Sequence, residues 1–327
     1  YIEVVPPQQR INRDWYKGSA DAIYQNLNLI KDENPTEVFV FGADHVYRMD
    51  LRPMYKLHMK KAAACTVAAL PVPIEQASEF GVIEVDENWW MIGFEEKPKK
   101  PKSIPGRPGF ALVSMGNYLF NSEVLVKEVM RDAGLDSSHD FGRDIIAGML
   151  GKMPVYIYDF FQNEVPGQEA DERGYWRDVG TLDAYFASQM DLINIKPVFS
   201  LYNREWPLLT FNRTLPPAKF VFDDPGSQRQ GLALNSMVSD GCIVSGGRLR
   251  KCILSPEVRI NSYSELEECI LFDAVQVGRR SRIRKAIIDK NVIIPPDTII
   301  GYDREADRKR FHVSENGVTV VPKGYQF

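Results

Sequence analysis

Residues 243–300 read IVSGGRLRKCILSPEVRINSYSELEECILFDAVQVGRRSRIRKAIIDKNVIIPPDTII, and aliphatic residues recur in this stretch at intervals of 17. Four columns share the interval, and their members are Ile243, Ile260, Val277 and Ile294; Leu249, Leu266, Ile283 and Ile300; Leu254, Leu271 and Ile288; and Val258, Val275 and Val292. One interval is too short for a pair of packed helices, and it is rich in β-branched residues broken by Gly and Pro. Three short strands per turn would instead place each column inside every coil. The repeat therefore predicts a short parallel β-helix in which each turn covers the next.

The chain before the repeat has a different pattern, in which apolar runs alternate with amphipathic stretches. Residues Val38–Phe41 are apolar without alternation, which is typical of a strand buried on both faces. Further strands are predicted at 91–94, 113–120 and 155–160, and helices at 20–30, 51–64 and 182–192. Ser19, Asp50 and Thr181 are placed to cap these three helices in turn. Asn121 or Ser122 can cap a fourth helix, which follows the strand 113–120. The pattern predicts βα units around a mainly parallel sheet.

The domain organisation follows from these two patterns. We expect an α/β domain over residues 1–196, a Pro-rich joining segment over 197–230 and the β-helix domain over 231–327. A chain of 327 residues exceeds the usual size of one hydrophobic core, which agrees with two domains.

Composition excludes several classes of protein. With 40 basic and 44 acidic residues the formal charge is −4, so there is no general electrostatic reason to bind nucleic acid or an anionic membrane. The longest mostly apolar run, Ala62–Val72, is too short to cross a bilayer, and Tyr1–Val5 lacks the features of a signal peptide. The four cysteines lack metal-site spacing, so we expect buried thiols in a reducing cytoplasm.

Two carboxylates stand at predicted strand ends. Asp44 follows the strand Val38–Phe41, and Asp178 lies in the segment YWRDVGT, which leads into a helix. Ligands of open α/β sheets bind beyond the carboxyl ends of strands, and Mg²⁺ takes one or two carboxylates together with substrate phosphates. The alternative is that Asp44 caps a turn, that His45 is a hydrogen-bonded structural histidine and that Asp178 forms an ion pair.

Two further motifs could bind an anionic substrate. Glu96 and Lys97 follow a predicted strand, where Lys97 could contact a phosphate and Glu96 could accept hydrogen bonds from sugar hydroxyls. Gly18 precedes a helix start, where a ligand can approach the backbone and negative charge is favoured. A solvated Glu–Lys pair and an ordinary capped turn are the structural alternatives.

The six motifs WYKGSADA, FGADHVYRMD, FEEKP, SSHDFG, YWRDVGT and PPAKF occur in this order, and the last leads into the repeat. As a set they resemble bacterial ADP-glucose pyrophosphorylases (glucose-1-phosphate adenylyltransferases) over almost the whole chain. The resemblance implies a Rossmann-like nucleotidyltransferase domain and a left-handed parallel β-helix. It also implies synthesis of ADP-glucose, the glycogen precursor, from ATP and glucose 1-phosphate, in a homotetramer controlled by anionic metabolites.

The resemblance also implies roles for individual residues. Asp44 and Asp178 would hold the catalytic Mg²⁺, and Lys97 would bind the phosphate of glucose 1-phosphate. The other residues implied in substrate binding are Tyr16 and Gly18 at the nucleotide, and Gly81, Glu96, Ser114, Asp140, Phe141 and Trp176 at the sugar. Some of the basic residues that follow the last coil are expected to bind an anionic effector, with a solvated surface as the structural alternative; they are Arg304, Arg308, Lys309 and Arg310.

One family motif has no counterpart in the sequence. The family opens with a Gly-rich loop of the form GGxGxRLxxLT, which wraps the triphosphate and supplies an essential arginine. The first domain here has only isolated glycines, and Gly246-Gly247-Arg248-Leu249 belongs to the repeat. We therefore expect a family member that lacks its N-terminal part and that is catalytically incomplete as it stands.

Three alternatives stay open beside this interpretation. A pyrophosphorylase that uses UTP, dTTP or GTP would share most of the motifs. A non-catalytic regulatory or structural subunit would explain the missing Gly-rich loop, although both Asp44 and Asp178 are retained. A hexapeptide-repeat acyltransferase would need a catalytic histidine, and the repeat from Ile243 to Ile300 contains none.

Overall fold

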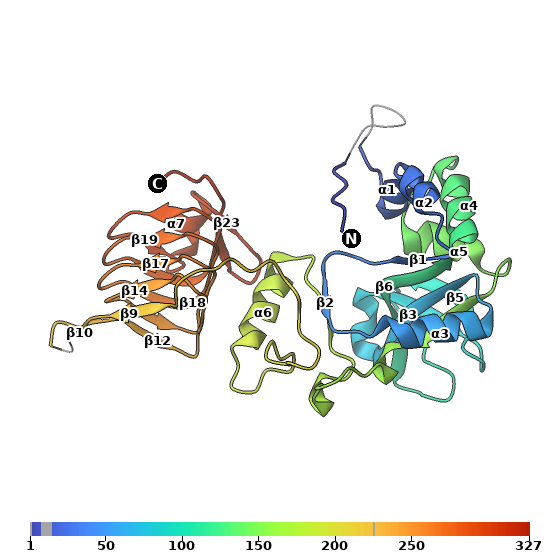
Figure 1. The fold of residues 1–327 in the computed structure, drawn as a ribbon, viewed down its shortest axis with the longest axis horizontal. Helices are drawn as coiled ribbons and strands as arrows, with labels where there is room; N and C mark the ends of the chain where they lie inside the picture. The colour runs from blue at the N-terminus through green and yellow to red at the C-terminus, as the bar shows by residue number, and fades with distance from the viewer. Residues whose placement is uncertain (1, 8–14, 225) are drawn as a thin grey trace. The chain divides into compact units, whose positions relative to one another are not determined.

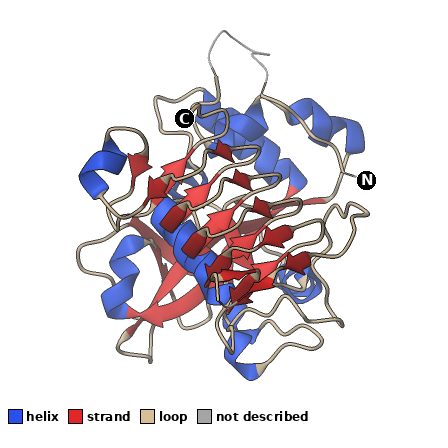
Figure 2. Ribbon diagram, turned by 90° about the vertical axis from the view of Figure 1, so that its left-hand side faces the viewer, coloured by secondary structure: helices blue, strands red, loops and turns tan. Residues whose placement is uncertain are grey.

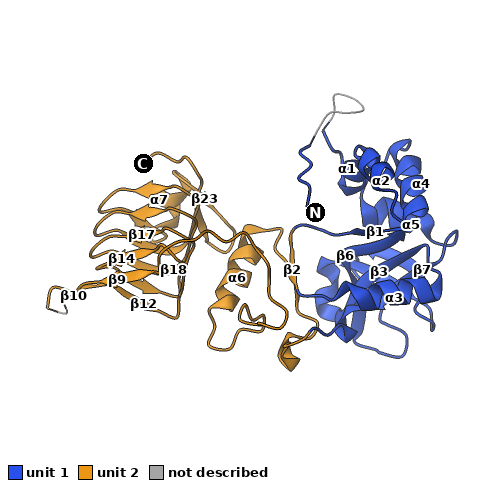
Figure 3. Ribbon diagram, viewed as in Figure 1, with its two compact units in different colours: residues 1–43, 48–165 blue, residues 44–47, 166–327 orange. Residues whose placement is uncertain are grey.

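The computed structural model describes residues 2–7, 15–224 and 226–327, in which contacts divide the chain into two compact units (Figures 1 and 3). Unit 1 comprises Tyr1–Ala43 and Arg48–Val165, and unit 2 comprises Asp44–Tyr47 and Pro166–Phe327. The boundaries expected at residues 196 and 230 stay a prediction. Within the described residues, no helix is both long and apolar enough to cross a membrane.

A mixed sheet forms the centre of unit 1 (Figure 3). Its strands are β1 (Glu37–Val40), β3 (Cys65–Pro73), β4 (Gly81–Val85), β5 (Met91–Glu96), β6 (Phe110–Asn121) and β7 (Val155–Asp159). The order is β5-β4-β6-β3-β7, with β1 also paired to β6. Among the described strands of this sheet, β3 and β7 form the only parallel pair, so the expectation of a mainly parallel sheet was wrong. The apolar pattern located β6 but carried no information on its direction, and β6 runs antiparallel between β1 and β3.

The first strand is less buried than its sequence indicates. All four residues of β1 are half-buried, which corrects the prediction of a strand buried on both faces. Within the part of the chain that the structure describes, β6 is its only paired neighbour. The buried strands are instead β3, whose first six residues are all buried, and most of β6.

The helices of unit 1 pack on this sheet. They are α1 (Ser19–Tyr24), α2 (Leu27–Glu33), α3 (Leu51–Lys61), α4 (Ser122–Ala133) and α5 (Ala147–Met149), with the 3₁₀-helices η1 (Ile74–Glu79) and η3 (Phe160–Gln162) and the π-helix η2 (Phe141–Ile146). The capping roles of Asp50 and Asn121 are confirmed, because each side chain accepts hydrogen bonds from the first turn of its helix. The predicted helix 20–30 is broken after Tyr24, and Ser19 does not cap it. The cap position is Gly18, and the Ser19 hydroxyl accepts a hydrogen bond from the Phe141 amide instead (3.2 Å).

Unit 2 contains the predicted β-helix, which is built from two stacks of strands that are parallel except for the pair β23 and β24 (Figures 1 and 2). One stack is ordered β21-β19-β17-β14-β9, with bounds Ile293–Ile294, Gln276–Val277, Arg259–Ile260, Ile243–Ser245 and Lys219–Val221. The other contains β12 (Leu232–Leu234), β15 (Arg248–Arg250), β18 (Glu265–Leu271), β20 (Arg282–Ile288), β24 (Thr319–Val321) and β23 (His312–Val313), with β13 (Met237–Val238), β16 (Ile253–Leu254) and β22 (Ile299–Ile300) beside them. The hairpin β10 (Asp223–Asp224) and β11 (Arg229–Gln230) and the helix α7 (Arg304–Arg308) complete this part.

Three of the four predicted columns are confirmed in full. Leu249, Leu266, Ile283 and Ile300 pair in register from coil to coil, and all are buried. The first column is wrong in its first member, because Ile260 pairs with the fully buried Val244 and not with Ile243. That coil is one residue shorter, and a shift of one residue turns a strand's side chains to the opposite face.

The remaining elements of unit 2 join the β-helix to a two-stranded ribbon. Helix α6 (Leu182–Leu192) begins at Thr181, whose hydroxyl accepts from the Ala184 amide, as predicted. Its Phe186 packs with Ile270, Ile287 and Val318 of the β-helix. The ribbon pairs β2 (His45–Tyr47) with β8 (Trp176–Asp178), and the short turn η4 spans Ala170–Glu172.

The stacked columns predict that two adjacent isoleucines of β21 contribute very differently to the free energy of unfolding. Replacing the buried Ile294 by Ala should lower the free energy of unfolding by about 2–5 kcal/mol, because it removes methyl groups from a packed column. Its neighbour Ile293 is 64% exposed, so Ile293→Ala should change stability by less than about 0.5 kcal/mol. Urea unfolding of the two variants measures both values, and equal losses would contradict the column assignment.

Candidate functional site

The β2–β8 ribbon brings two of the predicted site carboxylates together. Antiparallel pairing sets His45 opposite Asp178, so Asp44, the residue before β2, lies at the same end of the ribbon. The Asp44 carbonyl accepts the amide of Val179 (2.9 Å), which extends the contact beyond the strands. Ligand atoms of Asp44, His45 and Asp178 all lie within 4.8 Å of one another.

This group has the donor chemistry of a divalent cation site. Two carboxylates supply hard oxygen ligands, and the Asp44 side chain is 60% exposed, so it can reach a cation that also contacts substrate. The Asp178 carboxylate is oriented by the Gly180 amide, which donates to Oδ1 at 2.7 Å. A methyl group on Gly180 would lie 3.0 Å from Asp178 Oδ1 and 3.2 Å from Asp44 Oδ2, so this glycine keeps the space between the carboxylates clear.

His45 joins this group, although the sequence favoured a purely structural role for it. Its Nε2 lies 3.6 Å from Asp44 Oδ1, and its Nδ1 is buried without a hydrogen-bond partner in the structure. The ring is held by Trp176, which meets it edge-on at 5.0 Å between ring centroids. The sequence signal was its position next to Asp44, but only the strand pairing shows that it faces Asp178.

A second group of predicted residues gathers in unit 1 around a tyrosine that the sequence analysis did not single out. The ring of Tyr118 stacks on Phe141, with centroids 5.5 Å apart and an interplanar angle of 23°. Burial raises the pKa of Tyr118 above its usual value, while a hydrogen bond with Ser114 and the charges of Asp140 and Glu96 also act on it. Tyr118 therefore links four of the residues expected at the sugar.

The position of Glu96 explains why Gly81 is required. The two residues are paired between β4 and β5, and a methyl group on Gly81 would lie 2.6 Å from the Phe94 ring and 2.9 Å from Glu96 Oε2. Lys97 follows at the end of β5 with a left-handed backbone (φ 49°) and an exposed side chain. Its amide donates to the Phe80 carbonyl at 3.0 Å, so the backbone that carries Lys97 is tied to the start of β4.

Three predicted residues have structural contacts that the sequence did not indicate. Asp140 caps η2, because its Oδ1 accepts from the amides of Gly142 and Arg143 at 2.9 and 3.0 Å. The hydroxyl of Tyr16 accepts from the Asn26 side chain at 2.8 Å. The close approach expected at Gly18 is to the protein's own backbone, because an added methyl group would lie 2.3 Å from the carbonyl oxygen of Ser138.

Among the expected effector residues, two already have partners within the protein. Arg308 pairs with Glu305 in α7 at 2.8 Å, and the guanidinium of Arg310 lies 4.6 Å from the ring centroid of Phe311. The Arg304 guanidinium lies against Gly317, where a methyl group would be 2.4 Å from Nη2.

Comparison with known proteins matches both parts of the chain. Residues 2–195 match the family model described as nucleotidyl transferase, and residues 216–321 match the one described as GlmU-like, C-terminal hexapeptide. The chain is 58% identical over 325 residues to a glucose-1-phosphate adenylyltransferase of Anaeromyxobacter sp. (strain Fw109-5), covering 99% of this chain and 79% of that protein. It is 50% identical to the protein of that name from Frankia casuarinae and 48% identical to glucose-1-phosphate adenylyltransferase 1 of Vibrio parahaemolyticus, with the same coverage.

The ribbon geometry predicts a measurable divalent site. Mn²⁺, followed by electron paramagnetic resonance, should bind the protein, and Asp44→Asn or Asp178→Asn should weaken the affinity by about tenfold or more, because each removes a charged oxygen ligand. Asp171→Asn serves as the matched control, since this carboxylate is paired with Lys196 elsewhere in unit 2 (2.7 Å). Equal Mn²⁺ affinity of the wild type and both site variants would refute the site.

Proposed function

The chain belongs to the glucose-1-phosphate adenylyltransferase family, and on that premise we propose that it transfers the adenylyl group of ATP to glucose 1-phosphate, forming ADP-glucose and releasing pyrophosphate. The observation that carries the proposal is the group of Asp44, His45 and Asp178 on paired strand ends of a nucleotidyltransferase. Carboxylates in this arrangement suit a reaction between two phosphate-bearing substrates.

The proposed reaction is an in-line displacement. An oxygen of the glucose 1-phosphate phosphate group attacks the α-phosphorus of ATP, a new P–O bond forms, and the bond to pyrophosphate breaks. The nucleophile is already an anion, so no side chain has to remove a proton. The protein has to bring two anionic substrates into line. Good positioning can lower the activation free energy by about 7–11 kcal/mol.

Individual side chains divide this work. Lys97 supplies a positive charge to the phosphate of glucose 1-phosphate, and Glu96 accepts hydrogen bonds from sugar hydroxyls. Gly81, Ser114, Asp140 and Phe141 bind the sugar, Trp176 is a further sugar-binding residue, and Tyr16 and Gly18 contact the nucleotide. Asp44 and Asp178 would hold Mg²⁺, which would supply positive charge to stabilise the negative charge that develops on the phosphates.

The first test combines a nucleotide panel with a carboxylate variant. Pyrophosphate release by the product of the whole gene, with glucose 1-phosphate and each of ATP, UTP, dTTP and GTP, should be fastest with ATP. Asp44→Asn should then lower kcat by about 10²–10³-fold, because the charge that holds the cation is lost. Circular dichroism checks that the variant is folded, and full activity in the folded variant would remove Asp44 from the reaction.

The same assay shows which of the two substrates Lys97 contacts. Lys97→Gln should raise the KM for glucose 1-phosphate by about tenfold or more, since it removes the charge that contacts the sugar phosphate. The exposed Lys99, two residues further along, is the control, and Lys99→Gln should leave both KM values unchanged. A rise in the KM for ATP alone would assign Lys97 to the nucleotide.

These measurements also test two alternative functions. Preference for another nucleoside triphosphate would indicate a different pyrophosphorylase, and the absence of release with every nucleotide would indicate a non-catalytic subunit. The retained Asp44 and Asp178 favour the catalytic interpretation.

The wider setting is part of the proposal. We expect a homotetramer that supplies ADP-glucose for glycogen synthesis in the cytoplasm, where the four buried free cysteines stay reduced. Anionic metabolites are expected to regulate it through Arg304, Arg308, Lys309 and Arg310. The contacts of Arg308 with Glu305 and of Arg310 with Phe311 would have to yield to such a ligand.

A further inference from the structure

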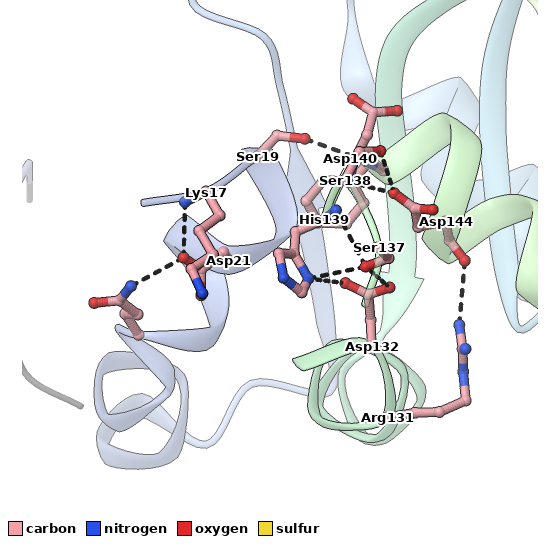
Figure 4. Close-up of polar contacts among 12 residues, drawn as sticks. Lys17, Ser19, Asp21, Arg131, Asp132, Ser137, Ser138, His139, Asp140 and Asp144 are labelled. Atoms are coloured by element: carbon pink, nitrogen blue, oxygen red, sulfur yellow. Dashed lines mark hydrogen bonds and ion pairs between the residues drawn. The ribbon is translucent and has the colours of Figure 1, made fainter. Parts of the chain in front are cut away.

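The segment between α4 and η2 lies beside the start of α1, with Ser137, Ser138 and His139 near Ser19 (Figure 4), and three successive contacts join them. The Ala20 amide donates to the His139 carbonyl at 2.8 Å, and the Phe141 amide donates to the Ser19 hydroxyl at 3.2 Å. Gly18 lies directly against this loop, because an added methyl group would be 2.4 Å from the carbonyl oxygen of His139. The loop that carries Asp140 and Phe141 is thus joined to the segment that carries Gly18.

The centre of this junction is His139, a buried histidine with a left-handed backbone (φ 53°). This conformation is uncommon for residues other than glycine and has to be held by surrounding contacts. The imidazole supplies them, since its Nδ1 lies 2.7 Å from Asp132 Oδ2 and 3.0 Å from the Ser137 hydroxyl. Ser137 in turn donates to Asp132 Oδ1 at 2.9 Å, so His139, Ser137 and Asp132 form a closed polar cluster.

A second carboxylate holds the loop from its other side. Asp144 of η2 accepts from the Ser138 hydroxyl and from the Asp140 amide, at 2.5 and 2.9 Å. Partial burial opposes the ionisation of Asp144, but these hydrogen bonds keep its pKa below the usual value. The residues on either side of His139 are therefore held by η2, whereas His139 itself is held by α4.

We propose that His139 is a positioning residue that couples the nucleotide-binding segment Gly18–Ala20 to the sugar-binding residues Asp140 and Phe141. The carbonyl of His139 accepts the hydrogen bond from the first turn of α1. The backbone conformation of His139 sets the position of Asp140, the residue that caps η2. Neither contact requires His139 to touch a substrate. The inference rests on the proposed function, because Gly18 and Asp140 are assigned to the nucleotide and the sugar there.

Coupling of this kind has a specific kinetic consequence. Releasing His139 should disturb both halves of the site together, whereas a residue that contacts one substrate should change the KM of that substrate. Loss of one hydrogen-bonded support costs about tenfold in affinity. The reacting groups are not removed, so kcat should change less than KM.

The test uses His139→Asn, because Asn tolerates a left-handed backbone but cannot reproduce the imidazole contact with Asp132. We expect the KM for ATP and the KM for glucose 1-phosphate each to rise about tenfold, with kcat within about threefold of the wild type. Ser137→Ala removes the hydroxyl contacts of the cluster but leaves the contact between His139 and Asp132, so it is the milder variant and should raise both KM values by about threefold. A change in neither KM, or in only one of them, would overturn the proposal.

The matched control is His58, an equally buried histidine in α3 that bonds to the Thr66 hydroxyl at 2.8 Å. His58→Asn should lower the melting temperature as His139→Asn does, while both KM values stay within about twofold of the wild type. If His58→Asn raised both KM values equally, the effect would be one of general stability and the proposal would fail.

Hydrogen exchange without substrates separates this proposal from the proposed function. In His139→Asn the amides of Ala20 and Phe141 should both exchange about tenfold faster, since the two hydrogen bonds at the junction are weakened together. Unchanged exchange at either amide would overturn the coupling even in an active enzyme. Faster exchange at both in a protein without pyrophosphate release would uphold the junction and reject the proposed reaction.

Discussion

The antiparallel pairing of β2 with β8 forces the side chains of Asp44 and Asp178 to one end of a short ribbon. Carboxylates held this close repel each other when both are charged, and solvent at the exposed Asp44 weakens that repulsion. In the proposed site, a bound divalent cation would offset the repulsion, so the strand register suits the cation-bound state. The Gly180 amide adds a fixed dipole at Asp178 that works in the same direction.

The ribbon is anchored through the helix that follows it. Thr181 caps α6 directly after Gly180, and the helix packs Phe186 onto Ile270, Ile287 and Val318. Its Asp183 accepts hydrogen bonds from the Ser314 hydroxyl and the Asn316 amide, at 2.5 and 3.3 Å. The coils of the β-helix therefore support one of the two site carboxylates, which gives this domain a mechanical connection to the proposed chemistry.

Unit 1 uses aromatic packing and backbone contacts for the same purpose. Phe141 stacks on Tyr118, and the loop before it is held between α4 and η2. The contact between His139 and Asp132 is buried, so losing it would leave a polar group without a partner away from water. This explains how a short irregular segment can keep Asp140 and Phe141 in place without regular secondary structure of its own.

The sequence alone determined the features that depend on local periodicity and on a residue's immediate neighbours. The 17-residue columns specified the β-helix, and Asp50, Asn121 and Thr181 each marked a helix start, because burial patterns and capping act within a few residues. Only the tertiary structure decided the direction of β6, the entry of Val244 in place of Ile243 and the contacts of His45, Tyr118 and His139. Each of these features depends on which distant segment becomes the neighbour in space. Pairing between distant strands and loops is set by the free energy of the whole fold and not by the adjacent residues in the sequence.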